Sequence, residues 1–175
     1  MTDKKKDWRS EMSLSDSELK TADLYDIHEE QLQICNPGFR HYGGHHAFHG
    51  PIATLKCFED NSLVRDQLEQ PGQGRVLVVD AGGSLRCAML GDLLAQKAVD
   101  NGWAGVVMHG CIRDAAEIAE MPLGVMALAT NPRKSVKKGA GEVGGEVNFS
   151  GVNFKPGEWL YADADGIVVL DRPAT

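Results

Sequence analysis

The chain has little that would mark a secreted, membrane-spanning or nucleic-acid-binding protein. Its four cysteines among 175 residues form no C-x-x-C pair, which excludes a zinc ribbon and a thioredoxin-type redox motif. No stretch approaches the roughly 20 consecutive apolar residues that a membrane helix needs. The basic residues near the start are followed by a polar segment, unlike a secretory signal. We therefore expect a reduced, cytoplasmic protein.

An excess of positive charge is also missing. Lysine and arginine number 18 against 25 aspartate and glutamate residues, so the formal net charge is −7. Such a molecule repels nucleic acid and acidic membranes, and we expect it to bind neither directly. Small anionic substrates remain compatible with this charge, because one arginine or metal ion in a cleft sets the local field.

The apolar pattern predicts one α/β or α+β domain over residues 15–175, after a flexible extension over residues 1–14. With 42% hydrophobic and 25% charged residues, the composition is that of a globular domain. The spacing of apolar residues and chain breakers predicts helices over 15–31, 61–70, 92–101 and 115–121. It predicts strands over 51–58, 75–80, 85–90, 103–108, 125–129, 147–154, 159–161 and 167–170, and a loop over 32–50.

One candidate binding segment is Gly91-Asp92-Leu93-Leu94, at the expected start of a helix. The first N–H groups of a helix have no partner within it and lie at the positive end of the helix dipole, so a carboxylate could bind there. The alternative is structural: Gly91 makes a turn and Asp92 caps the helix.

The second candidate is Arg113-Asp114, which follows a buried strand and opens the next expected helix. Arginine can hold a carboxylate through two parallel hydrogen bonds, and aspartate is a hard oxygen ligand suited to Mg²⁺ or Mn²⁺. An exposed ion pair between these neighbours is the structural alternative. Together the two segments make a site for a keto acid and a metal plausible.

These two segments also carry a resemblance to a known family. Asp92, the 20 residues that follow it and Arg113-Asp114 match the D-X20-R-D signature of class II pyruvate aldolases that cleave 4-hydroxy-4-methyl-2-oxoglutarate. Between Leu24 and Leu170 the chain resembles the wider family of the regulator of ribonuclease E activity A (RraA). The other stretches that carry this resemblance are 56–61, 74–80, 101–103 and 161–163.

The resemblance implies a three-layer β/β/α swivelling domain, like the phosphohistidine domain, assembled as a homotrimer with sites near subunit interfaces. It implies that the backbone of Gly91 to Leu94 receives the substrate carboxylate and that Arg113 binds the pyruvyl oxygens. Asp114 would hold Mg²⁺ or Mn²⁺ largely through water, and Asp92 would orient these groups. The implied reaction yields two pyruvates, with oxaloacetate decarboxylation as a side activity.

Two other sets of residues offer different chemistry. His41, His45, His46 and His49 lie within nine residues and could bind zinc or nickel. They do not form an i, i+4 pair on a predicted helix, so we expect structural or solvent-facing histidines, with a contribution of one of them to the active site as the alternative. A Schiff-base aldolase needs a desolvated lysine. Lys56 is the best candidate, and its position in a strand equally allows a solvated side chain.

Three points stay open at this stage. The basic run 133–138 is expected to be a solvated loop, with contact to an anion or partner as the alternative. Glu117 lies one helical turn beyond Arg113-Asp114 and could support a metal or face water. Finally, the family resemblance offers a function of another class: a protein that binds and inhibits ribonuclease E. The intact Asp92, Arg113 and Asp114 set favours the enzyme.

Overall fold

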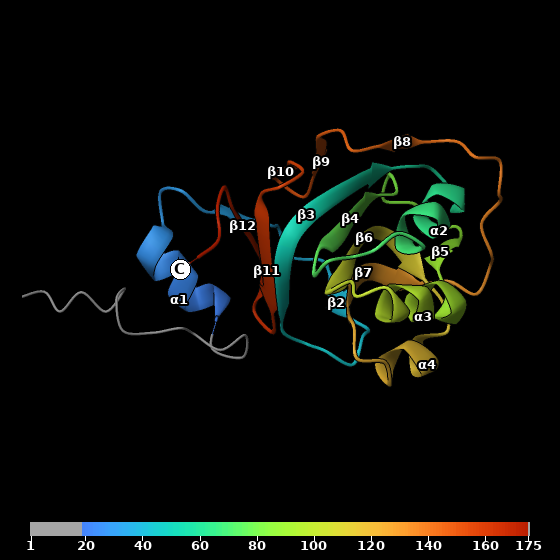
Figure 1. Cartoon of the computed structure of the whole chain (residues 1–175), viewed down its shortest axis with the longest axis horizontal. Coiled ribbons are helices and arrows are strands. Elements are labelled where there is room, and N and C mark those ends of the chain that lie inside the picture. The colour runs from blue at the N-terminus through green and yellow to red at the C-terminus, as the bar shows by residue number, and fades with distance from the viewer. Residues whose placement is uncertain (1–18, 175) are drawn as a thin grey trace, which may run out of the picture.

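The computed structural model describes residues 19–174, so the expected extension over 1–14 lies outside the described residues (Figure 1). The helices are α1 (Thr21–His28), α2 (Ser62–Leu68), α3 (Asp92–Asp100) and α4 (Ala115–Ala119). The strands of the first half are β1 (Gln33–Ile34), β2 (Arg40–His41), β3 (Phe48–Lys56), β4 (Val76–Asp80) and β5 (Ala88–Leu90). Those of the second half are β6 (Gly105–Ile112), β7 (Gly124–Thr130), β8 (Glu142–Val143), β9 (Val147–Phe149), β10 (Val152–Phe154), β11 (Trp159–Asp163) and β12 (Gly166–Leu170).

Strand β3 joins two parts of one mixed sheet, whose order is β1-β12-β11-β3-β4-β6-β7-β2. Its first residues pair antiparallel with β11, and Ile52 to Lys56 pair parallel with β4. Figure 1 shows β3 as a long curved arrow between these two parts. Because β3, β4, β6 and β7 run parallel, their carboxyl ends meet at one edge, where α/β proteins collect binding groups.

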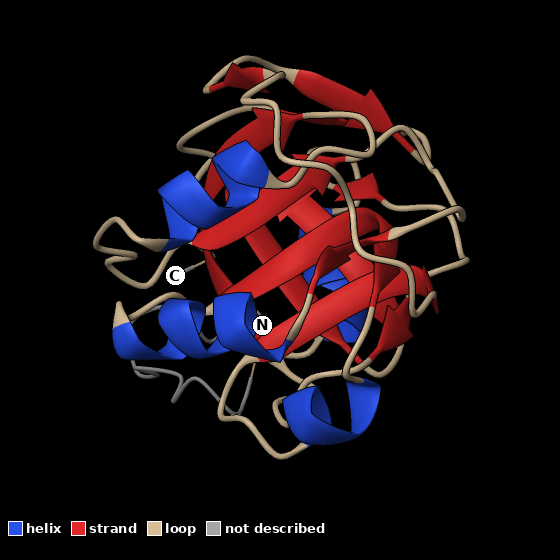
Figure 2. Ribbon diagram, turned by 90° about the vertical axis from the view of Figure 1, so that its right-hand side faces the viewer, coloured by secondary structure: helices blue, strands red, loops and turns tan. Residues whose placement is uncertain are grey.

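The elements form layers with a core on each side of the central strands. Along β4, Leu77 and Val79 face the core under α2, α3 and α4, whereas Val76 and Val78 face the core shared with β9, β10, β11 and β12. In Figure 2 the three helices lie in front of the crossing strands. Burial on both faces explains the continuous apolar run of this strand. The expected α/β fold and its β/β/α layering are confirmed, and α1 packs on the outer face of β11 and β12.

The structure differs from the sequence-based expectation at several boundaries. The segment 32–50 contains β1 and β2, which pair with β12 and β7; two-residue edge strands leave no periodicity to read in the sequence. Strand β6 continues to Ile112, four residues past its predicted end at Met108. Helix α1 begins only at Thr21 among the described residues. No helix in residues 19–174 has the length and apolar character that crossing a membrane requires.

Candidate active site

The two candidate segments lie side by side at the carboxyl edge of the parallel strands. Strands β5 and β6 pair in parallel, with Leu90 opposite Ile112. One residue later the Arg113 N–H donates a hydrogen bond to the Leu90 carbonyl at 2.9 Å. The turn into α3 and the turn into α4 are therefore held together by the sheet.

The Asp114 carboxylate links the two turns. Its Oδ2 accepts a hydrogen bond from the Asp92 N–H at 3.0 Å and lies 4.0 Å from Arg113 Nε. Gly91 leaves room for it: a Cβ at Gly91 would lie 2.8 Å from Asp114 Oδ2. The backbone of Gly91 is extended (φ −120°, ψ −172°), so this position requires space and not an unusual backbone angle.

Asp114 itself has a left-handed backbone, with φ 56° and ψ 41°. Aspartate tolerates this conformation better than most residues, at a modest cost in energy. Asp114 is the N-cap residue of α4 but its side chain makes no capping hydrogen bond there; the conformation turns the carboxylate toward the start of α3. The structural alternative for Arg113-Asp114, an exposed ion pair, corresponds only to the 4.0 Å contact between Arg113 Nε and Asp114 Oδ2.

Asp92 is the first residue of α3, and the N-cap is Gly91, without a side-chain cap. The Asp92 Oδ1 accepts a hydrogen bond from the Leu93 N–H at 2.8 Å. The Asp92 and Leu93 N–H groups at this helix start are thus both bound to carboxylates, consistent with an anion-binding turn.

The Arg113 guanidinium borders the same space. Its side chain is 42% exposed, and Nη1 donates to the Pro132 carbonyl at a long 3.5 Å. The 4.0 Å separation from the Asp114 carboxylate is at the limit of an ion pair, and an exposed pair of this kind contributes little to stability. The guanidinium is thus not committed to a strong structural interaction, and can turn its donors to an anion.

The remaining candidates do not join this site. The His41 ring Nε2 lies 2.6 Å from the Asp163 carbonyl, and His45 and His46 are exposed. Lys56 is exposed at the end of β3, which argues against a desolvated Schiff-base lysine, and Glu117 also faces solvent. Among the described residues, no three His, Cys, Asp or Glu side chains come together as a metal-binding group.

Sequence reasoning missed two buried carboxylates at the same edge of the sheet. Asp80 ends β4, accepts the Gly82 N–H at 3.0 Å and lies 3.5 Å from His109 Nδ1. The His109 ring stacks on Phe149, with centroids 4.5 Å apart. Asp60, 2% exposed, begins the turn into α2. An acidic residue at the end of an apolar strand is the signal that could have drawn attention to Asp80. Asp60 lies four residues beyond the end of β3 and has no such signal in the sequence.

Asp60 is the more tightly bound of the two. Burial alone would raise the pKa of its carboxyl group, but hydrogen bonds from Ser62, Ala140 and Lys138 outweigh burial and lower the pKa to about 2. Asp60 is therefore an anion at neutral pH.

The donor set fits one kind of metal. Asp114 is a single carboxylate whose side chain is 36% exposed. Mg²⁺ and Mn²⁺ suit such a position, because Mg²⁺ keeps several waters and needs only one or two protein carboxylates. A zinc site closed by four protein ligands does not fit these residues.

Comparisons with known proteins show the family to which the chain belongs. Residues 21–169 match the sequence model of the RraA-like family, described as Aldolase/RraA. The chain is 60% identical over 154 residues to a protein of Aromatoleum aromaticum, provisionally named 4-hydroxy-4-methyl-2-oxoglutarate aldolase; the match covers 88% of this chain and 97% of that one.

Two solved structures are also similar. The RNA-processing inhibitor RraA from Thermus thermophilis superposes with a TM-score of 0.88 at 47% identity, covering 90% of this chain and 96% of that one. The S-adenosylmethionine:2-dimethylmenaquinone methyltransferase from Geobacillus kaustophilus superposes with a TM-score of 0.87 at 54% identity, covering 89% and 96%.

Proposed function

Because the chain belongs to the RraA-like family, we propose that it is a divalent-metal-dependent class II aldolase that cleaves 4-hydroxy-4-methyl-2-oxoglutarate to two pyruvates. The observation that carries this proposal is the convergence of Gly91, Asp92, Arg113 and Asp114 around one carboxylate-binding helix start. The names of close relatives support the same activity.

The pyruvyl half of the substrate would bind between α3 and Arg113. Its carboxylate would take N–H groups of the Gly91 to Leu94 turn and replace the Asp92 side chain at the Leu93 N–H, while the Asp92 N–H remains bonded to Asp114. Arg113 would donate to the pyruvyl oxygens through its planar fork. These contacts hold the substrate so that its keto group faces Asp114.

Asp114 would hold Mg²⁺ or Mn²⁺ largely through water, and the Asp92 N–H bond would keep its carboxylate in place. When bound, the metal would polarise the keto oxygen and lower the cost of forming an enolate. The Arg113 guanidinium would add positive charge beside the oxygens on which negative charge develops.

The proposed cleavage converts one substrate molecule into two pyruvates with no net gain or loss of atoms. The 4-hydroxyl group loses a proton, the C3–C4 bond breaks, and C3 of the pyruvate enolate takes up a proton, so both products are pyruvate. Oxaloacetate decarboxylation passes through the same enolate and is the side activity that we expect.

A chelator experiment tests the proposal. Protein treated with EDTA should release no pyruvate from 4-hydroxy-4-methyl-2-oxoglutarate in a coupled assay, and Mg²⁺ or Mn²⁺ should restore turnover. Full activity in excess EDTA, or inactivation by borohydride in the presence of pyruvate, would instead indicate a Schiff-base enzyme.

We also propose that the chain forms a homotrimer with sites near subunit interfaces. Large apolar side chains stand exposed beside the site, with Leu93 76% and Leu85 58% exposed, and a neighbouring subunit could cover them. Analytical ultracentrifugation measures the assembly directly.

The similarity to the Thermus inhibitor RraA favours a second candidate function, binding to ribonuclease E. Arg113 separates the two candidates. Arg113→Ala removes charge-assisted hydrogen bonds and should lower kcat/KM by roughly a hundredfold, or about 3 kcal/mol. Arg113→Lys should restore only part of the activity, because lysine lacks the two-pronged geometry.

Affinity for a ribonuclease E segment should change little in either variant, since one side chain adds little to a broad electrostatic contact. Unchanged turnover in Arg113→Ala, or ribonuclease E binding by a wild type without aldolase activity, would favour the regulator.

A further inference from the structure

The segment 131–140, here called the basic strap, runs along the edge of the candidate active site. It leaves β7 beside Arg113: the Asn131 N–H donates to the Ile112 carbonyl at 3.0 Å, and the Ala88 N–H donates to the Arg133 carbonyl at 2.8 Å. The Arg113 Nη1 contact to Pro132 belongs to the same end. One end of the basic strap is thus bonded to both strands that lead into the site.

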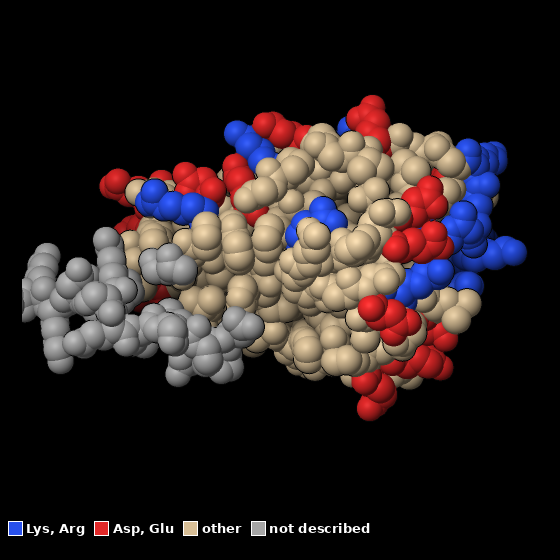
Figure 3. Space-filling model, in the orientation of Figure 1, with Lys and Arg blue, Asp and Glu red and all other residues tan. Residues whose placement is uncertain are grey.

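The basic strap concentrates positive charge in an otherwise acidic protein. It carries Arg133, Lys134, Lys137 and Lys138 and no acidic residue, and all four of these side chains are exposed. In Figure 3, Lys and Arg side chains gather at the right-hand end of the molecule, where Figure 1 places the chain between β7 and β8. The whole molecule repels anions, but this rim attracts them.

Little apolar packing holds the basic strap in place. Most residues of the basic strap are exposed. Val136 is its large apolar residue, and it is 50% exposed. Four like charges within six residues also repel one another. The position of the basic strap must therefore come chiefly from hydrogen bonds to its backbone.

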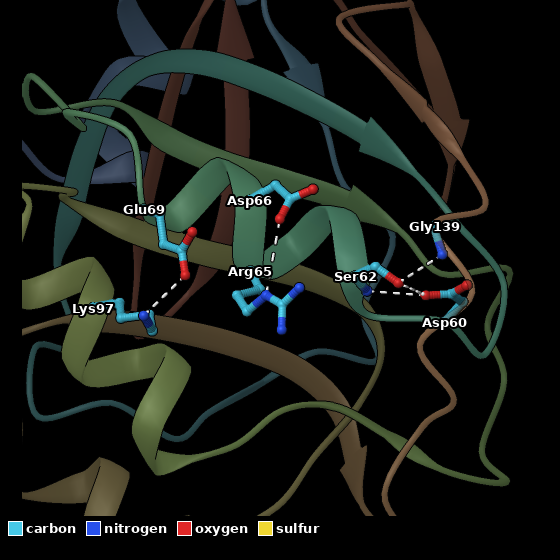
Figure 4. A network of polar contacts seen from close by, with 7 residues as sticks. All are labelled: Asp60, Ser62, Arg65, Asp66, Glu69, Lys97 and Gly139. Atoms are coloured by element: carbon cyan, nitrogen blue, oxygen red, sulfur yellow. Dashed lines mark hydrogen bonds and ion pairs between the residues drawn. The ribbon is translucent and has the colours of Figure 1, made fainter.

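Asp60 and Ser62, at the start of α2, supply these bonds. Asp60 Oδ2 accepts the N–H groups of Lys138 at 2.8 Å and Ala140 at 3.2 Å, and Ser62 Oγ accepts the Gly139 N–H at 2.9 Å. Asp60 Oδ1 accepts the Ser62 N–H at 2.9 Å and the Ser62 hydroxyl. Figure 4 shows Asp60, Ser62 and Gly139 drawn together, apart from the exposed pair Arg65–Asp66.

Burial makes this contact stronger than a surface bond. Asp60 is 2% and Ser62 6% exposed, and a buried carboxylate forms charge-assisted hydrogen bonds to backbone N–H groups. Asp60 and Val136 also form an isolated parallel β-bridge. In this bridge the Val136 N–H donates a hydrogen bond to the carbonyl of Glu59, the residue before Asp60, at 3.1 Å. The far end of the basic strap is thus held by hydrogen bonds to its backbone, as is the end beside Arg113.

We infer that Asp60 and Ser62 are positioning residues for the candidate active site: they hold the basic strap where its cations draw in substrates with more than one carboxylate. This inference rests on the proposed function, whose substrate is a keto acid with a second carboxylate beyond the bond that breaks. Neither residue touches the substrate; both act through the position of the basic strap.

The test compares Asp60→Asn with Asp66→Asn, a control on the same helix region whose exposed carboxylate pairs only weakly with Arg65, at 3.8 Å. Both variants lose one negative charge, which by itself would strengthen the attraction of an anion. Asp60→Asn should nevertheless raise KM for 4-hydroxy-4-methyl-2-oxoglutarate roughly tenfold at low ionic strength, with kcat within about twofold. Asp66→Asn should leave KM unchanged or slightly lower.

The dependence of KM on ionic strength distinguishes a positioning role of Asp60 from general damage to the fold. The KM values of the wild type and Asp60→Asn should converge as ionic strength rises, because salt screens exposed charges. Trypsin, which cuts after lysine and arginine, should cleave the native Asp60→Asn protein within 133–138 at least about tenfold faster than the wild type or Asp66→Asn. If Asp60→Asn fails to fold, Ser62→Ala, which loses only the bond to Gly139 and one to Asp60, takes its place.

The possible outcomes are distinct. A KM for Asp60→Asn no higher than that for Asp66→Asn overturns the inference, as does unchanged cleavage within the basic strap. A fall in kcat that salt does not alter also overturns it. If the wild-type protein releases no pyruvate, the proposed aldolase function is wrong, whatever the result of the trypsin experiment.

Discussion

At the residue scale, the candidate site depends on how closely Gly91 lets two turns approach. The Asp114 carboxylate lies over the glycine backbone, where a Cβ would come within 2.8 Å of Oδ2 and 3.4 Å of Arg113 Nε. Both atoms are ends of movable side chains. A larger residue would therefore displace the functional groups and leave the backbone largely as it is.

We predict that Gly91→Ala lowers kcat/KM by about a hundredfold, since a shift of about 1 Å in a reacting group can cost that much. The free energy of unfolding should change by less than about 1 kcal/mol, because the backbone at Gly91 suits any residue. Steady-state kinetics and urea unfolding measure the two effects. A variant with wild-type kinetics would show that Asp114 does not need its present position.

At the element scale, the first residue of β3 packs across two other strands of the sheet through its aromatic side chain. Phe48 lies across β6 and β7 at two glycines: a Cβ at Gly105 would lie 2.6 Å from the Phe48 ring, and a Cβ at Gly124 would lie 2.1 Å from it. Phe48 is 7% exposed. The close contact of these three strands requires glycine at both positions.

We expect Gly124→Ala to destabilise the protein by about 1–3 kcal/mol or more, because overpacking a core forces strained rotamers and backbone shifts. Gly145→Ala is the control, since a Cβ there meets nothing within 4 Å, and it should change stability by less than about 0.5 kcal/mol. Thermal unfolding of the two variants gives the comparison. Equal melting temperatures would contradict the packing described for Phe48.

At the scale of the whole molecule, the hydrogen-bonded Asp60 links the central sheet, α2 and the basic strap. Its pKa of about 2 in the folded protein lies below the value of about 3.9 expected in the unfolded chain. A lowered folded-state pKa means that the ionised carboxylate stabilises the fold. This stabilisation is fully present above about pH 4 and is lost as the pH falls through 2.

We therefore predict that the ionised Asp60 contributes about 2 kcal/mol at neutral pH. The difference in unfolding free energy between the wild type and Asp60→Asn should narrow between pH 4 and pH 2. Urea titrations at fixed pH values measure it, with Asp66→Asn as the matched control. A difference that stays constant over this range would indicate that Asp60 protonates at its ordinary pKa.

Local patterns in the chain were sufficient for much of the fold. The buried run Val76–Val79 and the helix beginning at Asp92 were predicted close to their true limits, because burial on two faces and helical spacing leave a local signal. The sequence placed Gly91-Asp92 and Arg113-Asp114 each between a predicted strand and a predicted helix, but only the structure shows that these two strands are neighbours.

Long-range contacts decided the rest. Strands β1 and β2 exist only because β12 and β7 supply their hydrogen-bond partners, so no local pattern reveals them. Asp60 reads as an ordinary polar residue in the sequence, and its role as an anchor depends on N–H groups 78 and 80 residues further along. The left-handed Asp114 and the space above Gly91 likewise arise from packing. The local sequence determined most helices and strands and the two turns, because burial and helical spacing leave a local pattern. Tertiary contacts determined how the carboxylates and cations are oriented around these turns.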